Sequence, residues 1–388
     1  MKKGWEYKKL LDVCDFQGGA QPPKSEWVKN PQNGYVRMLQ IRDFTQSREA
    51  VPEYVKLTNK VRTCSCDDIM VGRYGASVGK ILTGLAGAYN VALMKTLPDK
   101  DFLIKPYLRF YLLSNCFQGY LTSLGGRAAQ AGFSKDDLAN LSIALPPLSE
   151  QKEIVEYLDS SFAKIGKLKE NAAKNLEEAK ALFQSALKDA LESKEGWEEK
   201  TLKEISIIYG NYGLSVSSIP YNGVRYLRIT DITENGELND DKVSADISSG
   251  KTQEELQEGD ILFARTGATV GKTLIYRKEF GKCLFAGYLI RYRLNKDIVI
   301  PQFIHHFTHS SGYYKWVSSN QKAAAQPNIG AKVYNELKIH IPPLSEQQSI
   351  VSYLDSLNEK VNTLQQNYSR ICNECDALKQ AILRQVFE

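Results

Sequence analysis

The chain has 388 residues, of which 43% are hydrophobic and 24% charged, and its formal net charge is +5. This composition is ordinary for a soluble globular protein, and the length predicts two or more domains rather than one core. No apolar run is long enough to span a bilayer, and the basic start MKKGWEYKKL has no apolar stretch behind it, so we exclude membrane-spanning and secreted proteins and expect a cytoplasmic one.

The first 149 residues predict a mixed domain built on short strands. Runs rich in β-branched and aromatic residues lie at 35–41, 68–73, 80–83 and 90–97, and such runs favour strands. Pro106 then opens a helical stretch, because proline is well tolerated in the first turn of a helix. We therefore expect an α+β lobe with a strongly bent sheet.

The segment GASVGK at residues 75–80 invites comparison with a phosphate-binding loop, which we reject. That loop needs four residues between its first glycine and its Gly-Lys pair, whereas this segment has three and continues with Ile81 where Ser or Thr would hold magnesium. Two interpretations stay open. The segment is either a tight turn that presents Arg73 and Lys80 to phosphates, or a plain hairpin turn with solvated cations.

A loop of small residues, GGRAAQAGFS at 125–134, follows the helical stretch. It carries one cation, Arg127, and one amide side chain, Gln130. Such a loop can lie along a nucleic-acid backbone while its glutamine reaches base edges. Tyr74, among arginine and glycine residues, adds the aromatic character of many nucleic-acid-binding faces. The alternative is a loop that only orders the strand after it.

The sequence LSIALPPLSEQ marks a boundary between a strand and a long helix. Its two prolines exclude helix before them, and Ser149 is a candidate N-cap with Glu150 in the favourable first turn. Residues 150–195 then predict one helix. About 40 residues at about 1.5 Å each make a rigid spacer of roughly 60 Å.

The whole pattern repeats with a period close to 196 residues. LSIALPPLSEQKEIVEYLDS returns as LKIHIPPLSEQQSIVSYLDS, DIMVGRYGASVGK as DILFARTGATVGK, RMLQIRDFT as RYLRITDIT, and RAAQAGFS is echoed by AAAQPNIG. The chain thus divides into lobes at 1–149 and 196–344 and helices at 150–195 and 345–388. Segments between the repeated blocks share almost nothing, and variable loops on a constant frame commonly carry specificity.

The two lobes differ in charge, although both carry the repeated blocks. The first has 20 Lys and Arg against 13 Asp and Glu, a net +7, and the second has 18 against 16, a net +2. A basic excess suits an anionic partner. In the second lobe Arg265 and Lys272 flank the Gly-Lys turn, and Lys322 and Gln326 lie on the small-residue loop at 318–330.

The second helix has apolar residues at alternating spacings of four and three, which is typical of a coiled coil. These positions are Ile350, Leu354, Leu357, Val361, Leu364, Tyr368, Ile371, Cys375, Leu378 and Ile382. The matching positions of the first helix are Ile154, Leu158, Ser161, Ile165, Leu168, Ala172, Asn175, Ala179, Leu182 and Ala186. Small residues in one helix opposite large ones in the other favour pairing of the two helices, antiparallel because a lobe lies between them. Asn175 would then set the register. The alternative is that each helix lies on its own lobe.

No set of catalytic residues occurs in both lobes. All four histidines follow residue 300, so the first lobe cannot hold a histidine-dependent site. His305, His306 and His309 resemble a metal cluster, but the glutamate of the metalloprotease motif is absent, and we expect an exposed imidazole face and no metal. The seven cysteines have no zinc-finger spacing and are expected to be reduced thiols. These absences favour a binding protein over an enzyme.

The repeated lobe followed by the PPLSEQ block and a long helix resembles the specificity subunit of type I restriction-modification enzymes. The PPLSEQ block with its preceding strand, the GDILxxRxGAxVGK block and the Gly-Trp start of each lobe carry the resemblance, which covers essentially the whole chain. One departure is Asp67, which stands where the second lobe has Gly259.

The resemblance implies that each lobe is a target recognition domain that reads one half of a split DNA sequence. It also implies an antiparallel coiled coil that sets the gap between half-sites and docks methyltransferase subunits, two in number, and through them the ATP-dependent nuclease subunits. The chain itself would have no catalytic residues and no cofactor, whereas the methyltransferase would use S-adenosylmethionine. A nucleotide-dependent enzyme and a scaffold that binds only protein are the alternatives.

The candidate DNA-binding residues are basic, aromatic or amide side chains of the repeated blocks and loops. They are Arg37, Arg42, Arg73, Tyr74, Lys80, Arg127, Gln130, Arg225, Arg228, Arg265, Lys272, Lys322 and Gln326.

Overall fold

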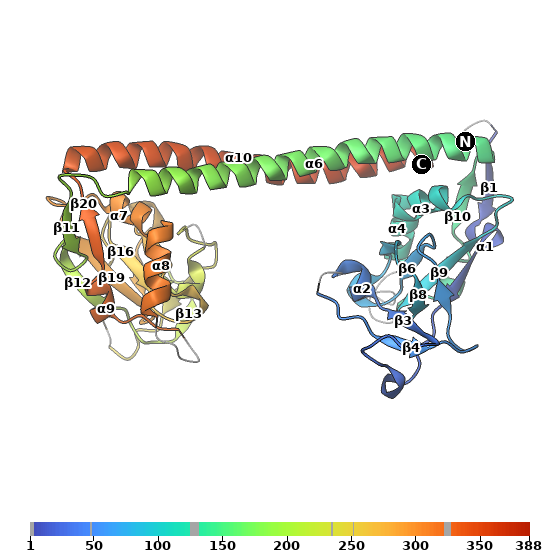
Figure 1. Ribbon diagram of the computed structural model, residues 1–388, viewed down its shortest axis with the longest axis horizontal. Helices are drawn as coiled ribbons and strands as arrows, with labels where there is room; N and C mark the ends of the chain where they lie inside the picture. The colour runs from blue at the N-terminus through green and yellow to red at the C-terminus, as the bar shows by residue number, and fades with distance from the viewer. Residues whose placement is uncertain (1–3, 47–48, 125–131, 234–235, 251, 322–326) are drawn as a thin grey trace. The chain divides into compact units, whose positions relative to one another are not determined.

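The computed structural model describes residues 4–46, 49–124, 132–233, 236–250, 252–321 and 327–388, which form two compact units (Figure 1). Unit 1 comprises Met1–Ala172 and Ser369–Glu388, and unit 2 comprises Ala173–Tyr368. Two long helices, α6 (Leu148–Ala190) and α10 (Leu344–Phe387), each contribute a segment to both units. Each compact unit therefore combines one lobe with parts of both helices.

The lobe of unit 1 is built on two four-stranded sheets with helices packed beside them. The strands are β1 (Glu6–Lys9), β2 (Cys14–Gly18), β3 (Tyr35–Leu39), β4 (Tyr54–Lys56), β5 (Thr63–Cys64), β6 (Met70–Gly72), β7 (Ile81–Leu82), β8 (Gly87–Tyr89), β9 (Leu93–Pro98) and β10 (Ser142–Leu145). The helices are α1 (Leu10–Val13), α2 (Ile41–Thr45), α3 (Lys105–Leu113) and α4 (Asn115–Ser123), with short 3-10 turns η1 (Lys24–Glu26), η2 (Gly75–Ser77) and η3 (Asp136–Leu138).

The lobe of unit 2 contains the same kinds of element. Its strands are β11 (Glu198–Thr201), β12 (Ser206–Tyr212), β13 (Ser218–Pro220), β14 (Arg225–Leu227), β15 (Val243–Ala245), β16 (Ile261–Ala264), β17 (Thr273–Ile275), β18 (Cys283–Phe285), β19 (Leu289–Leu294) and β20 (Lys338–Ile341). Its helices are α7 (Pro301–Phe307), α8 (Ser311–Asn320) and α9 (Ala331–Asn335), and its 3-10 turns are η4 (Ile229–Asp231), η5 (Gly267–Thr269) and η6 (Lys278–Phe280).

The two lobes share one sheet topology. The central antiparallel sheet runs β2-β9-β6-β7 in unit 1 and β12-β19-β16-β17 in unit 2. A parallel pair also recurs, β3 with β8 and β14 with β18, and an antiparallel pair joins the start of each lobe to its end, β1 with β10 and β11 with β20. The duplicated α+β fold predicted from the sequence is therefore confirmed.

The long helices begin earlier than predicted, so the assignment of Ser149 as an N-cap is wrong. The backbone carbonyl of Pro147 already accepts the N–H of Gln151 at 2.9 Å, and that of Pro343 accepts the N–H of Gln347 at 3.0 Å. Helical bonding therefore starts before each serine, and Ser149 and its copy Ser345 lie inside the first turn.

A buried glutamine fixes each helix start to its lobe. The Gln151 amide donates to the carbonyls of Phe102 at 2.7 Å and Pro146 at 3.0 Å and accepts the Ile104 N–H at 3.1 Å. Its copy, Gln347, makes the same three bonds, with Ile298, Pro342 and Ile300. Burying an amide side chain costs free energy unless its N–H and C=O groups form hydrogen bonds. These bonds explain why the repeated PPLSEQ block has its glutamine in both copies.

Within each unit the two helix segments run antiparallel, as predicted (Figure 1). In unit 1, Leu158 of α6 shares a core with Leu383 and Phe387 of α10, and Lys169 pairs with Asp376 at 2.7 Å. In unit 2, Leu187 of α6 shares a core with Leu354 of α10. Both cores also include residues of the lobe, so each lobe packs against both helices rather than against its own helix alone.

The predicted heptad positions are only partly right. Leu168, Leu182, Leu364 and Leu378 are exposed, and Asn175 is exposed too, so it does not set a register. On α6, Leu158 and Ile165 are buried as predicted, but beyond Ile165 the buried positions are Leu176 and Leu187, each eleven residues after the one before. Eleven residues in three turns follow the period of a straight helix more closely than heptads do, which explains why the heptad pattern drifts off the buried face.

Candidate nucleic-acid interface

The two Gly-Lys segments are hairpin turns at the edge of the central sheets. In unit 1 the turn joins the antiparallel strands β6 and β7, and the N–H of Gly72 donates to the Lys80 carbonyl at 2.9 Å. Gly75 and Gly79 have φ of +55° and +77°, which glycine adopts without strain. A phosphate-binding loop would lead from a strand into a helix, and neither segment does so. The structure thus supports the rejection of that motif, and Lys80 is exposed on the turn.

An arginine stacked on a tyrosine stands at the start of each turn. The Arg73 guanidinium lies 5.1 Å from the ring centre of Tyr74, and the Arg265 guanidinium lies 4.9 Å from that of Tyr212. Tyr212 comes from β12, so it is 53 residues away in sequence and no sequence pattern connected it to Arg265. A guanidinium that lies over an aromatic ring is attracted to the ring face, which limits the orientations that it samples.

The backbone holds both arginines in the same way. The Arg73 N–H donates to the Ala92 carbonyl at 2.9 Å, and the Arg265 N–H donates to the Tyr288 carbonyl at 3.0 Å. The Arg73 and Arg265 carbonyls accept the N–H of Phe133 at 3.3 Å and of Ile329 at 2.9 Å. These equivalent bonds fix the backbone of the two arginines in the same way in each lobe. Their side chains are held differently, because Nε of Arg73 donates to the Phe133 carbonyl at 3.0 Å, whereas Nε of Arg265 has no hydrogen-bond partner among the described residues.

The small-residue loops return to the lobe beside these arginines. Residues 125–131 and 322–326, with the candidates Arg127, Gln130, Lys322 and Gln326, lie outside the described residues, so these four stay predictions. The described residues next to each loop contact the turn. In the first lobe, Gly132 approaches Tyr74 so closely that a Cβ would lie 2.3 Å from its ring. In the second lobe, the Gly267 N–H donates to the Pro327 carbonyl at 3.0 Å. The turn and the end of the loop therefore form one continuous surface in each lobe.

The arginines of the other repeated block are engaged within the lobes. Arg37 pairs with buried Asp43 at 2.7 Å, Arg42 with Glu53 at 2.6 Å, and Arg228 with Asp231 and Asp241, each at 2.7 Å. Arg225 is buried and donates to the carbonyls of Asn239 and Asp241. Arg225 therefore holds a loop in place, whereas Arg37, Arg42 and Arg228 stay predictions as DNA contacts.

The turn arginines differ from Arg37, Arg42 and Arg228 in their ion pairing with carboxylates. Among the described residues, Arg73, Lys80 and Arg265 form no ion pair with a carboxylate, and the buried Nε of Arg265 has no hydrogen-bond partner. Lys272 is half-buried on the second turn. An unneutralised cation at the surface attracts a polyanion more strongly than one already paired.

A hollow of about 680 Å³ lies beside Arg265 in unit 2. Residues from separate elements line it, including Arg228, Tyr226, Ser217, Gly287 and the exposed Tyr288. Gly287 and Gly213 have no room for a side chain, because a Cβ would lie 2.6 Å and 2.2 Å from neighbouring atoms. The hollow combines guanidinium groups with an aromatic ring, which is the combination that nucleic-acid surfaces use.

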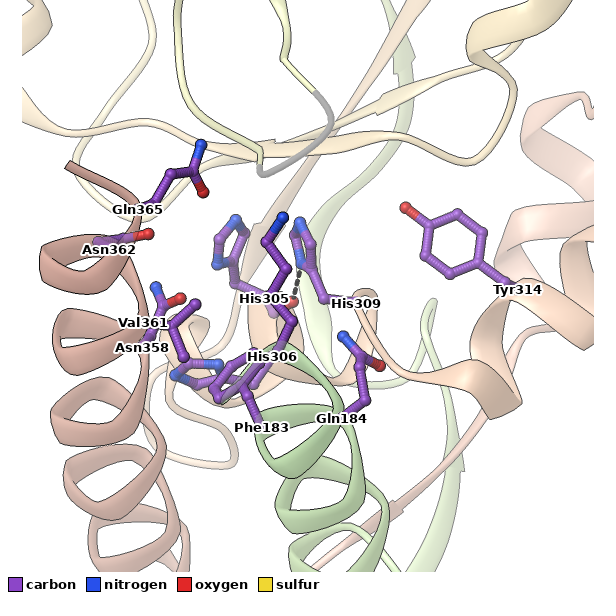
Figure 2. A pocket seen from close by; sticks show the side chains of 11 residues that line it. Phe183, Gln184, His305, His306, His309, Tyr314, Asn358, Val361, Asn362 and Gln365 are labelled. Carbon is purple, nitrogen blue, oxygen red and sulfur yellow. Dashed lines mark hydrogen bonds between the residues drawn. The ribbon is translucent and has the colours of Figure 1, made fainter. Parts of the chain in front are cut away.

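The histidine cluster is not the exposed face that we predicted. His306 is buried and contacts Asp355 of α10 at 2.7 Å, while His305 and His309 are half-buried beside a cavity of about 370 Å³ (Figure 2). Burial lowers the pKa of all three imidazoles. In the part of the chain that the structure describes, no group of three or more His, Cys, Asp or Glu side chains is placed to hold a metal ion.

Two other features can be read directly from the structure. All seven cysteines are free thiols, as predicted. None of the described helices is both long and apolar enough to cross a lipid bilayer.

The family model for the type I restriction modification DNA specificity domain matches this chain twice, at residues 2–178 and 194–371. The chain belongs to this specificity family. The two matches coincide with the two sequence repeats, so each copy of the domain contains one lobe, one Gly-Lys turn and one stacked arginine.

Known specificity subunits resemble the chain over nearly its whole length. The MjaVIII specificity subunit of Methanocaldococcus jannaschii is 26% identical over 381 residues, which cover 92% of this chain and 87% of that protein. The EcoKI specificity subunit of Escherichia coli is 22% identical over 416 residues, covering 100% and 89%.

Solved structures share the fold. A chain from a study of complex assembly and conformational transition in a type I restriction-modification system superimposes with a TM-score of 0.77 at 20% identity, covering 99% of this chain and 98% of that one. The HsdS subunit of Thermoanaerobacter tengcongensis superimposes with a TM-score of 0.58 at 20% identity, covering 100% and 97%. The specificity family and the duplicated fold predicted from the sequence are both confirmed.

Proposed function

We propose that this protein is the non-catalytic, DNA-binding specificity subunit of a type I restriction-modification complex. In this proposal each lobe reads one half of a bipartite target in double-stranded DNA. The observation that carries it is the repeated surface of a stacked arginine, a Gly-Lys turn and the end of a small-residue loop, which occurs once in each copy of the DNA specificity domain.

The chemistry of this surface suits DNA. Arginine can bind guanine through two parallel hydrogen bonds or bind phosphate, and stacking on tyrosine limits the orientations that it samples. The exposed Lys80 adds a phosphate-binding cation in the first lobe. Because the inserts around the two turns differ in sequence, the two lobes would read unlike half-sites.

We further propose that the helix starts dock methyltransferase subunits, one at each copy. Tyr157 of α6 and its copy Tyr353 of α10 are 50% and 53% exposed, and the preceding Leu148 and Leu344 are exposed as well. Equal exposure of large apolar side chains at repeated positions supports two equivalent docking surfaces. The methyltransferase would supply S-adenosylmethionine chemistry, and the restriction subunits would join through it, so this chain would need no cofactor.

Methylation mapping tests the DNA-recognition proposal directly. The chain is co-expressed with its methyltransferase partner, and methylated adenines are mapped by single-molecule sequencing. We expect one bipartite motif, and replacing residues 1–149 with the lobe of another specificity subunit should change only one half of it. Methylation without a bipartite motif, or a swap that alters both halves, would contradict the proposal.

The docking proposal predicts a loss of assembly when the exposed tyrosines are removed. Tyr157→Ala combined with Tyr353→Ala should weaken methyltransferase binding about tenfold or more, because a central exposed tyrosine often contributes over 1 kcal/mol to an interface. Size-exclusion chromatography with light scattering measures the assembly. Leu182→Ala, another exposed apolar position on α6, is the control and should leave it unchanged. Normal assembly of the double variant would exclude this docking surface.

A further inference from the structure

His305, in the last turn of α7, and His309, in the turn just after the helix, point their outer ring nitrogens toward the same place. His305 and His309 are four residues apart, and their ring centres lie 4.5 Å from each other (Figure 2). The Nδ1 of His309 lies 2.7 Å from the His305 carbonyl. Since a carbonyl can only accept, Nδ1 carries the proton and Nε2 of His309 keeps its lone pair.

The environment leaves both Nε2 atoms available to a ligand. Nε2 of His305 is buried and has no hydrogen-bond partner among the described residues. Gly236 faces both rings with a φ of +72°, and a Cβ built on it would lie 2.8 Å from Nε2 of His309 and 2.9 Å from Nε2 of His305. Any side chain at position 236 would therefore fill the space toward which both nitrogens point.

We propose that His305 and His309 form a binding site for a borderline divalent metal ion such as Ni²⁺ or Zn²⁺. His305 lies in the last turn of α7 and His309 in the turn that follows the helix. Two imidazoles four residues apart can chelate one metal ion, at metal–nitrogen distances of about 2.0–2.1 Å. The hydrogen bond from Nδ1 of His309 to a carbonyl is the contact that usually orients a metal-binding histidine. Water would occupy the remaining positions, because the described residues offer no third protein ligand.

The positively charged side chains near His305 and His309 are paired with carboxylates, which reduces their repulsion of a bound metal cation. Arg277 pairs with Glu237 at 3.4 Å and with Glu279 at 3.5 Å. Lys180, which lines the same cavity, pairs with Glu177 at 3.3 Å. Each nearby cation thus has its own carboxylate. From the sequence we expected no metal, and this proposal replaces that expectation. The proposed site is independent of DNA recognition, because the first lobe has Arg109 and Leu113 at the positions of these histidines.

The test is titration of the full chain with NiCl₂ by isothermal calorimetry under reducing conditions with a non-chelating reductant. We expect one saturable site in the wild type, and at least about tenfold weaker binding in His305→Gln and in His309→Gln, because loss of one of two chelating groups removes most of the affinity. His340→Gln is the matched control. It changes a half-exposed histidine on β20 outside the cluster and should bind as the wild type does.

A spectroscopic experiment separates this site from the seven cysteines. Co²⁺ bound by imidazole and water gives weak visible bands, whereas thiolate ligation adds an intense near-ultraviolet charge-transfer band. The proposal is supported if the visible bands appear without the charge-transfer band and disappear in His309→Gln. It is overturned if the wild type binds no metal, if both histidine variants bind like wild type, or if the charge-transfer band accompanies binding. Should His305→Gln fail to fold by circular dichroism, the His309→Gln result alone decides between these outcomes.

Discussion

Arg265→Ala, in the chain assembled with its methyltransferase, is expected to weaken binding to the cognate duplex by roughly 10- to 100-fold, or about 1–3 kcal/mol. The guanidinium lies over Tyr212 and forms no ion pair among the described residues, so the variant removes an oriented cation without leaving a buried carboxylate unpaired. Arg73→Ala is the equivalent change in the first lobe and should have an effect of similar size. Fluorescence anisotropy with a labelled duplex measures both.

The pattern of specificity distinguishes base contact from general electrostatic attraction. If the arginine reads a base, Arg265→Ala relaxes selectivity in one half-site and Arg73→Ala in the other. If the arginine contacts phosphate, the variant binds all DNA sequences more weakly. The slope of log affinity against log salt concentration then decreases by about one, because one fewer counterion is released on binding. Arg370→Ala, which removes an equal charge from an exposed position of α10, is the control and should change neither. Wild-type affinity in both turn variants would remove these arginines from the interface.

The sequence predicted the frame of this protein better than its interface. Strands at 35–41, 68–73 and 90–97 and the long helices were recognised, because period and turn residues are local properties of the chain. The turn was predicted as well, since Gly75 and Gly79 need positive φ and therefore mark it in sequence.

Features that depend on tertiary contacts were missed. Tyr212 under Arg265 belongs to a strand paired with β19, and only the folded sheet brings the two together. Arg225 was predicted as a candidate DNA contact, yet its side chain is buried in the lobe, where it donates to the carbonyls of Asn239 and Asp241. The expected exposure of His306 failed for the same reason, because α10 supplies Asp355 from 49 residues away.

The largest stability effect is expected from Asp260→Ala in unit 2. The Asp260 carboxylate is almost fully buried and accepts two hydrogen bonds from Arg293, at 2.8 and 2.9 Å, as well as the N–H of Gln257 at 2.9 Å. Arg291, itself buried, lies 3.9 Å away. Among the described residues, removing the carboxylate leaves the half-exposed Glu254 as the one remaining carboxylate partner of these guanidinium groups. Breaking a buried ion pair by deleting one partner typically costs about 3–5 kcal/mol.

Asp68 provides an internal comparison, because it is the copy of Asp260 in unit 1. Its partners are Lys105 at 2.7 Å and Lys95 at 3.5 Å. Burial opposes ionisation of Asp68, but hydrogen bonds from Lys105 and from Ser65 outweigh it and lower the pKa of this carboxyl. Both lysines keep partial contact with water, so Asp68→Ala should cost less than Asp260→Ala, by roughly 1 kcal/mol or more.

Urea denaturation of the full chain, combined with hydrogen exchange measured by mass spectrometry, tests this difference. Asp260→Ala should accelerate exchange in the strands β16 and β19 of unit 2 and leave β6 and β9 of unit 1 unchanged, whereas Asp68→Ala should do the reverse and more weakly. Asp260→Asn keeps an acceptor for the Gln257 N–H but not the charge. An effect of Asp260→Asn close to that of the alanine variant would therefore assign the stabilisation to the ion pair with Arg293 rather than to the backbone hydrogen bond, and equal stability of all variants would show that the buried pair contributes nothing.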